Sequence, residues 1–476
     1  MANVAFIVLP PLVVGALLAS ASHRIDRRLA WLSSLAVMAA SSAAALASAM
    51  REGGLRVTWG LGGKVSFSFY LAVDPLNSAF LVLASLISLA CLIYSLGYVA
   101  ERVQVYAGLT LLFASGILGC LASMDMVSFY LFWELMVWSS YALIYLYGER
   151  RDASRASLLY LLISHVASTA LLFGFLALYS LKGTFNLLEV KGLRLTEPLE
   201  VFAAAAISIG LLIKMGVAPL LHVWLPDAHS EAPTPISAML SGLMIEVAAY
   251  GFLRVIYGCW DLEAIKPAAW LLWGCGLLML SYAAMLSFSQ FDIKRFMAYS
   301  SINEMGLAVF ALGLFTKGGA VAAMVHVLNH ELVKSLLFLY AGCIVHELGV
   351  RDMRALGDML WFMPEASAAG LIASLSIIGI PGLNIFVGEL LIYMEGVKAG
   401  LLAPTVAAAV MMAVFSAAWL RFINRVMLTR RRMGRVRPPL TMLAPMIALA
   451  AACLVLGLYP EPLIAAAESA AEIVLS

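Results

Sequence analysis

The chain has 476 residues, of which 63% are hydrophobic and only 12% charged, and its formal net charge is +2. Soluble domains carry about 25% charged residues, so this composition excludes an ordinary soluble enzyme and predicts a multi-pass membrane protein. The small net charge gives no reason to expect a nucleic-acid partner. The six cysteines are scattered and form no CxxC pair, so we expect packing residues and neither zinc nor iron–sulfur ligands.

Mostly apolar runs of about 20 residues, the length that crosses a bilayer, predict about 14 transmembrane helices and an all-α polytopic fold. The runs lie near 4–20, 29–50, 75–98, 106–124, 126–147, 155–180, 202–225, 235–258, 267–288, 296–315, 319–346, 364–398, 402–428 and 439–458. The first run lacks a preceding basic segment and a cleavage site, which favours a membrane helix over a signal peptide. Only the connections near 51–70 and 181–199 are long and polar, which leaves no room for a soluble catalytic domain.

Basic residues concentrate in the loops that follow odd-numbered helices. They are Arg24, Arg27, Arg28, Arg102, Arg150, Arg151, Arg155, Lys294, Arg295, Arg351, Arg354, Arg421, Arg425, Arg430, Arg431, Arg432, Arg435 and Arg437. Short loops rich in Lys and Arg stay on the inner side of a membrane. With an even number of helices, both termini are then expected on the outer side of the cell membrane. The basic run at 429–435 is interpreted as a topology determinant.

Seven ionisable residues lie deep inside the apolar runs. They are Glu134, Lys214, Glu246, Glu304, His330, Lys334 and Glu389. A charge at the centre of a bilayer costs roughly 2.5–3.5 kcal/mol even on insertion scales, so such residues usually face a protein-lined or watery path. Their recurrence along the chain predicts a relay for ions.

Two of the predicted helices contain a proline close to such a residue. Lys214 precedes Pro219 in the seventh helix, and Glu389 follows Pro381 in the twelfth. Proline removes a helical hydrogen bond, and paired broken helices indicate inverted repeats around a midplane ion path. A tolerated kink at each proline is the alternative. The predicted divisions are 1–103 for helices 1–3, 104–260 and 261–430 for two inverted five-helix repeats, and 431–476 for helix 14.

The eleventh helix carries His326, His330 and Lys334 at a spacing of four residues. This spacing puts them on one face, over about 12 Å at 1.5 Å per residue. Histidine gains or loses a proton near neutral pH, and burial brings a lysine closer to that range. The pattern favours proton transfer. Haem ligation is the alternative, for which the candidate ligands are His165, His222, His326 and His330.

Three segments resemble the antiporter-like subunits of respiratory complex I. They are FYLFWELM at 129–136, HVWLPDAHSEAPTPISA at 222–238 and KRFMAYSSI at 294–302. The same family includes Mrp-type cation/proton antiporter subunits and the proton-pumping arms of membrane-bound hydrogenases and formate hydrogenlyases. The resemblance extends from about Asp74 to Glu389. Glu389 stands where many relatives have lysine and resembles the distal-middle antiporter-like subunit of complex I.

The resemblance implies roles for individual residues. Glu134 is expected to tune Lys214 in the first half, while His326, His330 and Lys334 form the centre of the second half and Glu389 ends it. The long segment at 222–238 adds three supporting residues, which are His222, Asp227 and His229.

Two positions depart from the family pattern. Relatives commonly have lysine where this chain has Glu246, and many place histidine where it has Glu304. Glu246 either accepts a proton from Lys214, or pairs with it, or neutralises a base of a neighbouring subunit. Glu304 either supplies a branch of the path or hydrogen-bonds between helices.

The function implied is redox-driven proton translocation by a subunit without a redox site of its own. A proton is expected to enter from the inner side, pass Lys214, Glu246, His330 and Lys334, and leave near Glu389. Iron–sulfur clusters and a flavin or nickel–iron centre are expected on partner subunits of an NADH:quinone oxidoreductase or hydrogenase type of complex.

The expected partners are further antiporter-like and other membrane subunits, a peripheral redox module and the lipid bilayer. Three alternatives remain at this stage. The first is an Mrp-type subunit that exchanges Na⁺ for H⁺, the second a stand-alone transporter of an organic solute, and the third a haem-bearing oxidoreductase.

Overall fold

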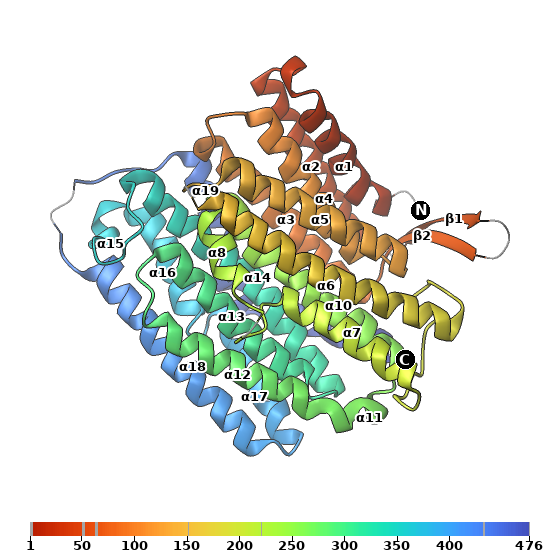
Figure 1. Ribbon diagram of the computed structural model, residues 1–476. Coiled ribbons are helices and arrows are strands. Elements are labelled where there is room, and N and C mark those ends of the chain that lie inside the picture. The colour runs from red at the N-terminus through yellow and green to blue at the C-terminus, as the bar shows by residue number, and fades with distance from the viewer. Residues whose placement is uncertain are drawn as a thin grey trace.

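The computed structural model describes residues 3–49, 53–61, 65–150, 152–219, 221–431 and 434–475, and nearly all of this part of the chain is helical (Figure 1). Arg151 and Arg432, two of the basic loop residues, and both terminal residues lie outside the described residues. Part of the connection predicted near 51–70 lies outside them as well.

The N-terminal part combines helices with one antiparallel hairpin. Its elements are α1 (Asn3–Ser20), the 3₁₀ turn Ser22–Arg24, α2 (Arg27–Ala49), β1 (Gly53–Leu61), β2 (Val65–Val73) and α3 (Pro75–Tyr98). The hairpin pairs Gly53 with Val73 and Leu61 with Val65, and it projects from the helical body (Figure 1). The sequence predicted a polar loop here because a nine-residue strand is well below the length of about 20 apolar residues by which membrane helices are recognised.

The next elements surround the first predicted break. They are α4 (Val103–Ala122), α5 (Met126–Tyr147), α6 (Ala153–Lys182), α7 (Pro198–Lys214) and α8 (Trp224–Glu231). Asp125 caps α5 by accepting hydrogen bonds from the backbone of Val127 and Ser128. Such caps satisfy amide groups that have no partner inside the helix. The α7 helix ends at Lys214, and Gly216 follows with φ +80°, a conformation that favours glycine.

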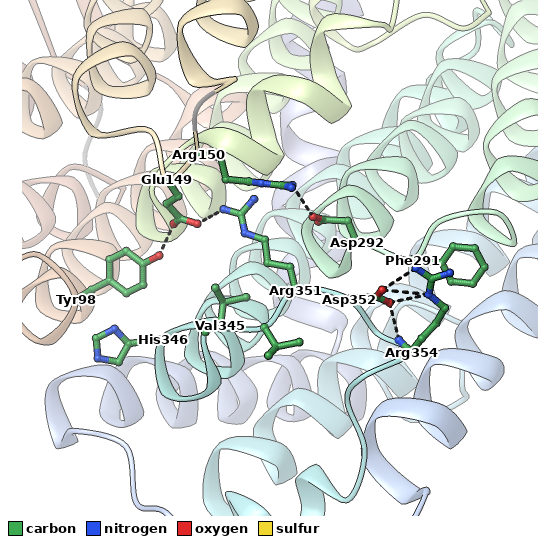
Figure 2. Close-up of a pocket in the computed structure, with 12 residues that line it drawn as sticks. Tyr98, Glu149, Arg150, Phe291, Asp292, Val345, His346, Arg351, Asp352 and Arg354 are labelled. Carbon is green, nitrogen blue, oxygen red and sulfur yellow. Dashed lines mark hydrogen bonds and ion pairs between the residues drawn. The ribbon is translucent and has the colours of Figure 1, made fainter.

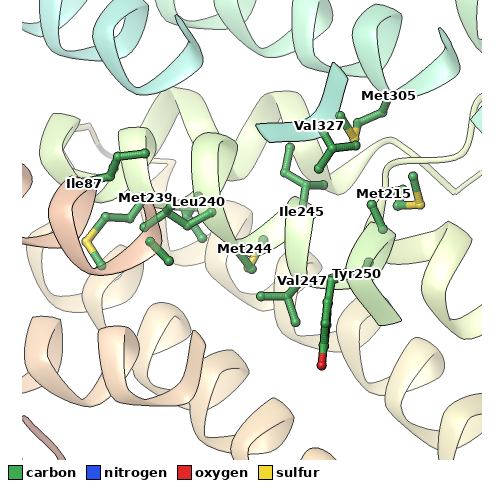
Figure 3. Packing of buried hydrophobic residues seen from close by; sticks show 14 of the residues in the cluster. Ile87, Met215, Met239, Leu240, Met244, Ile245, Val247, Tyr250, Met305 and Val327 are labelled. Carbon is green, nitrogen blue, oxygen red and sulfur yellow. The ribbon is translucent and has the colours of Figure 1, made fainter. Parts of the chain in front are cut away.

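The helix predicted near 235–258 is continuous but irregular. It consists of α9 (Thr234–Met239), a π-helical turn (Leu240–Met244), α10 (Ile245–Gly251) and a second π-helical turn (Phe252–Tyr257). Every residue of its most apolar stretch is buried. Figure 3 shows Met244 and Tyr250 of this helix packed among apolar side chains that include Ile87 and Met305. The helix therefore runs through the core of the molecule.

The second half repeats the sequence of long helices followed by a broken one. Its elements are α11 (Leu262–Ile265), the 3₁₀ turn Lys266–Ala268, α12 (Ala269–Ser287), α13 (Ile293–Leu312), α14 (Lys317–Leu348), α15 (Met359–Phe362), α16 (Pro364–Ser376), α17 (Asn384–Lys398), α18 (Leu402–Phe422) with a final π-helical turn (Ile423–Leu428), α19 (Leu440–Leu458) and α20 (Glu461–Leu475). The break at 377–383 separates α16 from α17, as the proline at 381 predicts.

The α14 helix is the central element. It packs against α3, α9, α13, α16, α17, α19 and α20 (Figure 1), and its most apolar stretch is fully buried. Because each of its faces meets another helix, all three members of the His326, His330 and Lys334 ladder are enclosed by protein.

Ten helices in the described residues are long and apolar enough to cross a membrane. The other four predicted spans correspond to α1, α13 and the two broken helices, so the total of 14 stays a prediction. The α20 helix was missed because it has only 15 residues and carries three glutamates. It packs against α3 and α14.

Candidate functional site

Lys214 lies at the end of α7 and is fully buried. Its Nζ donates hydrogen bonds to Tyr160 Oη at 3.1 Å and to Ser164 Oγ at 2.9 Å. Nζ also lies 4.5 Å from the ring centroid of Tyr160 and 5.3 Å from that of Trp224, a range in which aromatic rings attract a cation. The lysine is therefore held by hydroxyls and rings, with no acid in direct contact.

Glu134 lies on α5 at the surface of the helical body. Its Oε2 is 3.9 Å from His165 Nε2, and the two side chains are 22% and 41% exposed. Trp138 packs edge-on against His165 with 5.2 Å between ring centroids. No ion pair within 4 Å joins Glu134 to Lys214 in the part of the chain that the structure describes, although the carboxylate acts on the lysine electrostatically.

Glu246 lies on α10 and hydrogen-bonds directly to His330 Nδ1 on α14. Both side chains are buried, at 1% and 0% exposure. Glu246 Oε2 and His330 Nε2 have no hydrogen-bond partner among the residues that the structure describes. A direct pair between Glu246 and Lys214, one of the roles expected for this acid, is therefore wrong in this structure. The acid belongs to the second-half ladder.

Lys334, one turn further along α14, is also fully buried. Its Nζ donates to the Met297 carbonyl oxygen at 2.5 Å and to Ser300 Oγ, both on α13. The carboxylates of Glu304 and Glu246 act on it electrostatically. The second lysine thus sits between two acids without touching either of them.

His326 begins the ladder and meets Glu304 of α13. Its Nε2 lies 3.2 Å from the Glu304 carbonyl oxygen and 3.3 Å from Glu304 Oε2. Glu389, on α17 after the break, is buried, and the carboxylate of Glu304 acts on it electrostatically. Asn384 at the start of α17 donates to the Asn329 backbone oxygen at 3.1 Å, which fixes the broken helix against α14. The structure thus brings the predicted terminal acid next to the ladder.

The three supporting residues differ from one another. His229 is fully buried, and neither ring nitrogen has a hydrogen-bond partner in the described part of the chain. The charges of both relay lysines act on its ring. Asp227 instead pairs with the half-exposed Arg295 at 2.7 Å. His222 packs edge-on against Tyr282 with 4.8 Å between centroids. Only His229 lies among the relay residues.

Several residues of the site were not singled out from the sequence. Tyr160 and Ser164 are four apart on α6, a spacing that puts them on one face, so this signal was available. Glu331 follows His330 on α14 and is buried, and its Oε2 has no hydrogen-bond partner in the described ranges. Its link to the site is the charge of Glu246, which acts on it electrostatically, and the sequence gives no signal of that interaction. No group of three His, Cys, Asp or Glu side chains in the described residues is arranged to hold a metal ion.

Eight residues of the site have buried polar atoms without a hydrogen-bond partner among the described residues. They are Glu134, His229, Glu246, Glu304, His326, His330, Glu331 and Glu389. Native proteins satisfy nearly all buried polar groups with protein or ordered water. Some atoms elsewhere, such as Ser48 Oγ and Trp260 Nε1, also lack a partner among the described residues. Within the site, the unpartnered atoms fit a set of groups that exchange protons with one another through water.

Comparison with known proteins gives this arrangement a family. The family model described as "NADH:quinone oxidoreductase/Mrp antiporter, TM" matches residues 123–416. The chain belongs to this family. A second model, described as "NADH-Ubiquinone oxidoreductase (complex I), chain 5 N-terminus", matches residues 59–106. The resemblance predicted from the three sequence segments is confirmed, and the chain is an antiporter-like integral membrane protein.

Curated relatives and solved structures agree with this assignment. The chain is 31% identical to NADH-quinone oxidoreductase subunit M of Rickettsia conorii, over 72% of this chain and 70% of that protein. It is 31% identical to NADH-quinone oxidoreductase subunit N of Desulforudis audaxviator, over 90% of each.

Two solved structures have the same fold along the whole chain. One is a chain of the Mrp complex from Dietzia sp. DQ12-45-1b, with a TM-score of 0.89, 24% identity and full coverage of both chains. The other is a chain of respiratory complex I from Thermus thermophilus with bound NADH, with a TM-score of 0.87, 24% identity and full coverage of both. At 24% identity, these two comparisons show a common fold and nothing more.

Proposed function

We propose that this chain is a proton-translocating membrane subunit of a redox-driven complex. The observation that carries the proposal is the row of buried titratable side chains from Lys214 on α7 to Glu389 on α17, in a chain of the NADH:quinone oxidoreductase/Mrp antiporter family. Burying ionisable side chains in the membrane interior costs free energy, so such residues usually mark an ion path.

The contacts suggest an order along the path. Protons pass from Lys214 by way of His229 to Lys334 and the Glu246–His330 pair. They continue to His326 and Glu304 and leave near Glu389. Each neighbour in this order either touches the next or acts on it electrostatically. Water molecules complete the steps that have no direct contact.

Coupling is proposed to be electrostatic. Two unit charges 4 Å apart interact by about 4 kcal/mol at an effective dielectric constant of 20, which is enough to change which neighbour holds a proton. A change of charge near Glu134 therefore alters the protonation of Lys214, and each site then responds to the one before it. The mechanism therefore needs only electrostatic interactions between neighbouring charged groups, of like or opposite sign.

The surroundings of the chain follow from its relatives. Proteins named NADH-quinone oxidoreductase subunit M and N are its relatives at 30% identity and above, which supports a place among other membrane subunits, beside a peripheral redox module. Iron–sulfur clusters and a flavin or nickel–iron centre are proposed to lie on those partners, so this chain itself carries out no redox chemistry.

The proposed orientation puts the basic loops on the inner side of the membrane and both termini on the outer side. The proposed repeats are 104–260 and 261–430. Each repeat contains one broken helix that bears a titratable residue next to the break, which are Lys214 and Glu389. The equivalent position of these two breaks supports the division.

Exchange of Na⁺ for H⁺, as in an Mrp-type subunit, is the alternative. Proton uptake that needs Na⁺ on the opposite side of the membrane would favour the alternative, whereas uptake driven by an electron donor without Na⁺ would exclude it. The assay is made on inverted membrane vesicles that contain the whole complex.

The proposal is tested with Lys214→Ala in the assembled complex. We expect proton uptake driven by electron transfer to fall about 100-fold, since a positioned proton carrier contributes factors of about 10² to 10⁴ to a transfer step. Wild-type uptake in this variant, at equal amounts of assembled complex and with electron transfer intact, would sink the proposal.

A further inference from the structure

A second group of ionisable side chains lies outside the relay, around a cavity on the face that carries the basic loops. The cavity has a volume of about 770 Å³ and opens where the loops after α5, α12 and α14 meet. Figure 2 shows Glu149, Asp292, Arg351 and Arg354 around it. In the orientation proposed above, this cavity faces the inner compartment.

The walls of the cavity are held by backbone hydrogen bonds between two of the loops. Ile293 N donates to the Arg351 carbonyl at 3.0 Å, and Met353 N donates to the Phe291 carbonyl at 2.8 Å. These bonds form an antiparallel bridge between Asp292 and Asp352. The cavity is therefore a built feature of the fold, and its shape does not depend on exposed side chains alone.

Glu149 closes the inner end of the cavity. Its carboxylate accepts hydrogen bonds from Tyr98 and Arg351, and Oε1 lies 3.1 Å from Lys294 Nζ. Burial alone raises the pKa of the Glu149 carboxyl, but the positive charges of Lys294 and Arg351 outweigh that effect and hold the pKa below its usual range. The side chain is 18% exposed, so it is ionised and still reached from the cavity.

Lys294 lies on the other side of Glu149 and is fully buried. Its Nζ donates to the Ala232 carbonyl at 2.6 Å. Ser237 Oγ lies within hydrogen-bond distance of that carbonyl, at 3.1 Å, and of the His229 carbonyl, at 2.8 Å, and its single proton is shared between them. The charge of Lys294 acts on the His229 ring, as do those of the two relay lysines. One ion pair thus separates the cavity from the buried relay.

We propose that this cavity is the inlet through which protons reach the relay, and that Glu149 and Lys294 pass them inward. The inference rests on the proposed function. Lys294 releases a proton toward His229 while Glu149 accepts one from water in the cavity. Glu149 then passes this proton on to Lys294. One proton has entered, and both side chains of the pair are charged again. Arg351 cannot release a proton and acts as a positioning residue.

A purely structural role for the ion pair makes a different prediction, because such a pair needs only its charges. Lys294→Arg keeps the positive charge and the partner Glu149, but arginine stays protonated in proteins. Lys317→Arg is the matched control, since Lys317 forms a similar pair with Glu472 at 3.0 Å on the opposite end of α14 and both side chains are more than half exposed.

The experiment measures proton uptake driven by electron transfer in inverted vesicles that contain the assembled complex. Lys294→Arg is expected to lower uptake about tenfold or more, and Lys317→Arg is expected to leave it unchanged. Wild-type uptake in Lys294→Arg would overturn the inlet. If Lys294→Arg takes up protons like the wild type while Lys214→Ala abolishes uptake in the same assay, the inlet is wrong and the proposed function still stands.

A second measurement does not depend on changing the ion pair. Val350 lines the cavity, and the six native cysteines are buried or half-buried. Val350→Cys is labelled from the basic face with a bulky, membrane-impermeant maleimide. Uptake is expected to drop in the labelled variant and to stay constant in wild-type vesicles given the same reagent. Complete labelling with unchanged uptake would also overturn the proposal.

Discussion

Lys214 and Lys334 are equally buried, yet what surrounds them differs. Lys214 contacts the hydroxyls of Tyr160 and Ser164, and the acid that acts on it, Glu134, is 22% exposed at the surface of the helical body. Lys334 contacts a backbone carbonyl and Ser300, and the acids that act on it are 1% exposed or less. One lysine is open to influence from outside the chain, and the other is enclosed.

This difference suggests a division of labour. A neighbouring subunit that covered α5 and α6 would reach Glu134 directly and so change the charge next to Lys214. The second-half ladder responds only to groups within this chain. The first half is then suited to receive a signal, and the second half is suited to carry the proton onward without leakage to lipid or solvent.

The largest effect is expected at the enclosed lysine. Lys334→Arg keeps the charge but removes the ability to release a proton, so proton uptake driven by electron transfer is expected to fall about 100-fold. Uptake is measured in inverted vesicles with equal amounts of complex. The exposed Lys398→Arg, whose lysine pairs with Glu395 at 2.6 Å, is the control. Uptake within twofold of wild type in Lys334→Arg would contradict a role of Lys334 as a proton carrier and leave Lys214 as the only relay lysine proposed for that role.

The next largest effect is expected at the pair that links α10 to α14. Glu246→Gln keeps a hydrogen-bond acceptor for His330 but cannot take up a proton, so uptake is expected to fall about tenfold. Glu472→Gln, which alters an exposed acid, serves as the control. If Glu246→Gln pumped normally, this acid would be only a structural partner of His330. The difference between the two halves would then lie in the lysines themselves.

A smaller effect is expected at the hydroxyl that holds Lys214. Tyr160→Phe removes the hydrogen bond from Lys214, worth about 0.5–1.5 kcal/mol, together with the contacts of the same hydroxyl to Ser140 and Met244. Ser164 stays in place, so uptake is expected to fall by no more than about tenfold. Tyr257→Phe is a matched control, because Tyr257 is equally buried and donates to the Leu312 carbonyl outside the relay. A loss in Tyr160→Phe as large as that in Lys334→Arg would mean that the tyrosine itself carries the proton.

The smallest effect is expected on stability, and it concerns how the ionised Glu149 stabilises the protein at different pH. Because the pKa of this carboxyl is held below its usual range, its stabilising effect is present above the unfolded value of about 4.3. It is lost as the pH falls through the lower folded value. Thermal unfolding of the purified complex is therefore expected to distinguish wild type from Glu149→Gln at pH 7, by about 1.5–3 kcal/mol. The gap is expected to close in strong acid, and a gap that widens on acidification would contradict this assignment.

Most of the fold and about half of the site were predictable from the sequence. Hydropathy predicted the long helices, Pro219 and Pro381 predicted the breaks, and the four-residue spacing of His326, His330 and Lys334 predicted the ladder. The structure adds the β1–β2 hairpin and α20. Hydropathy does not detect them because each strand has nine residues, fewer than the roughly 20 of a membrane helix, and α20 carries three glutamates.

Contacts between distant elements were not predictable. The π-helical turn at Leu240–Met244 adds a residue to the turn, which rotates the face that follows by about 100°. A regular helical wheel therefore gives the wrong direction for Glu246, and its partner His330 could not be foreseen. The ion pair of Glu149 with Arg351 joins loops 202 residues apart, and nothing local in either loop indicates it.

The most direct test of the account is the number of protons moved per pair of electrons by the assembled complex. The double variant Lys214→Met with Lys334→Met is compared with the double control Lys317→Met with Lys398→Met, which removes two exposed lysines instead. We predict a lower ratio in the first variant and the wild-type ratio in the control. The same ratio in both variants would contradict the claim that protons cross this chain through its buried lysines.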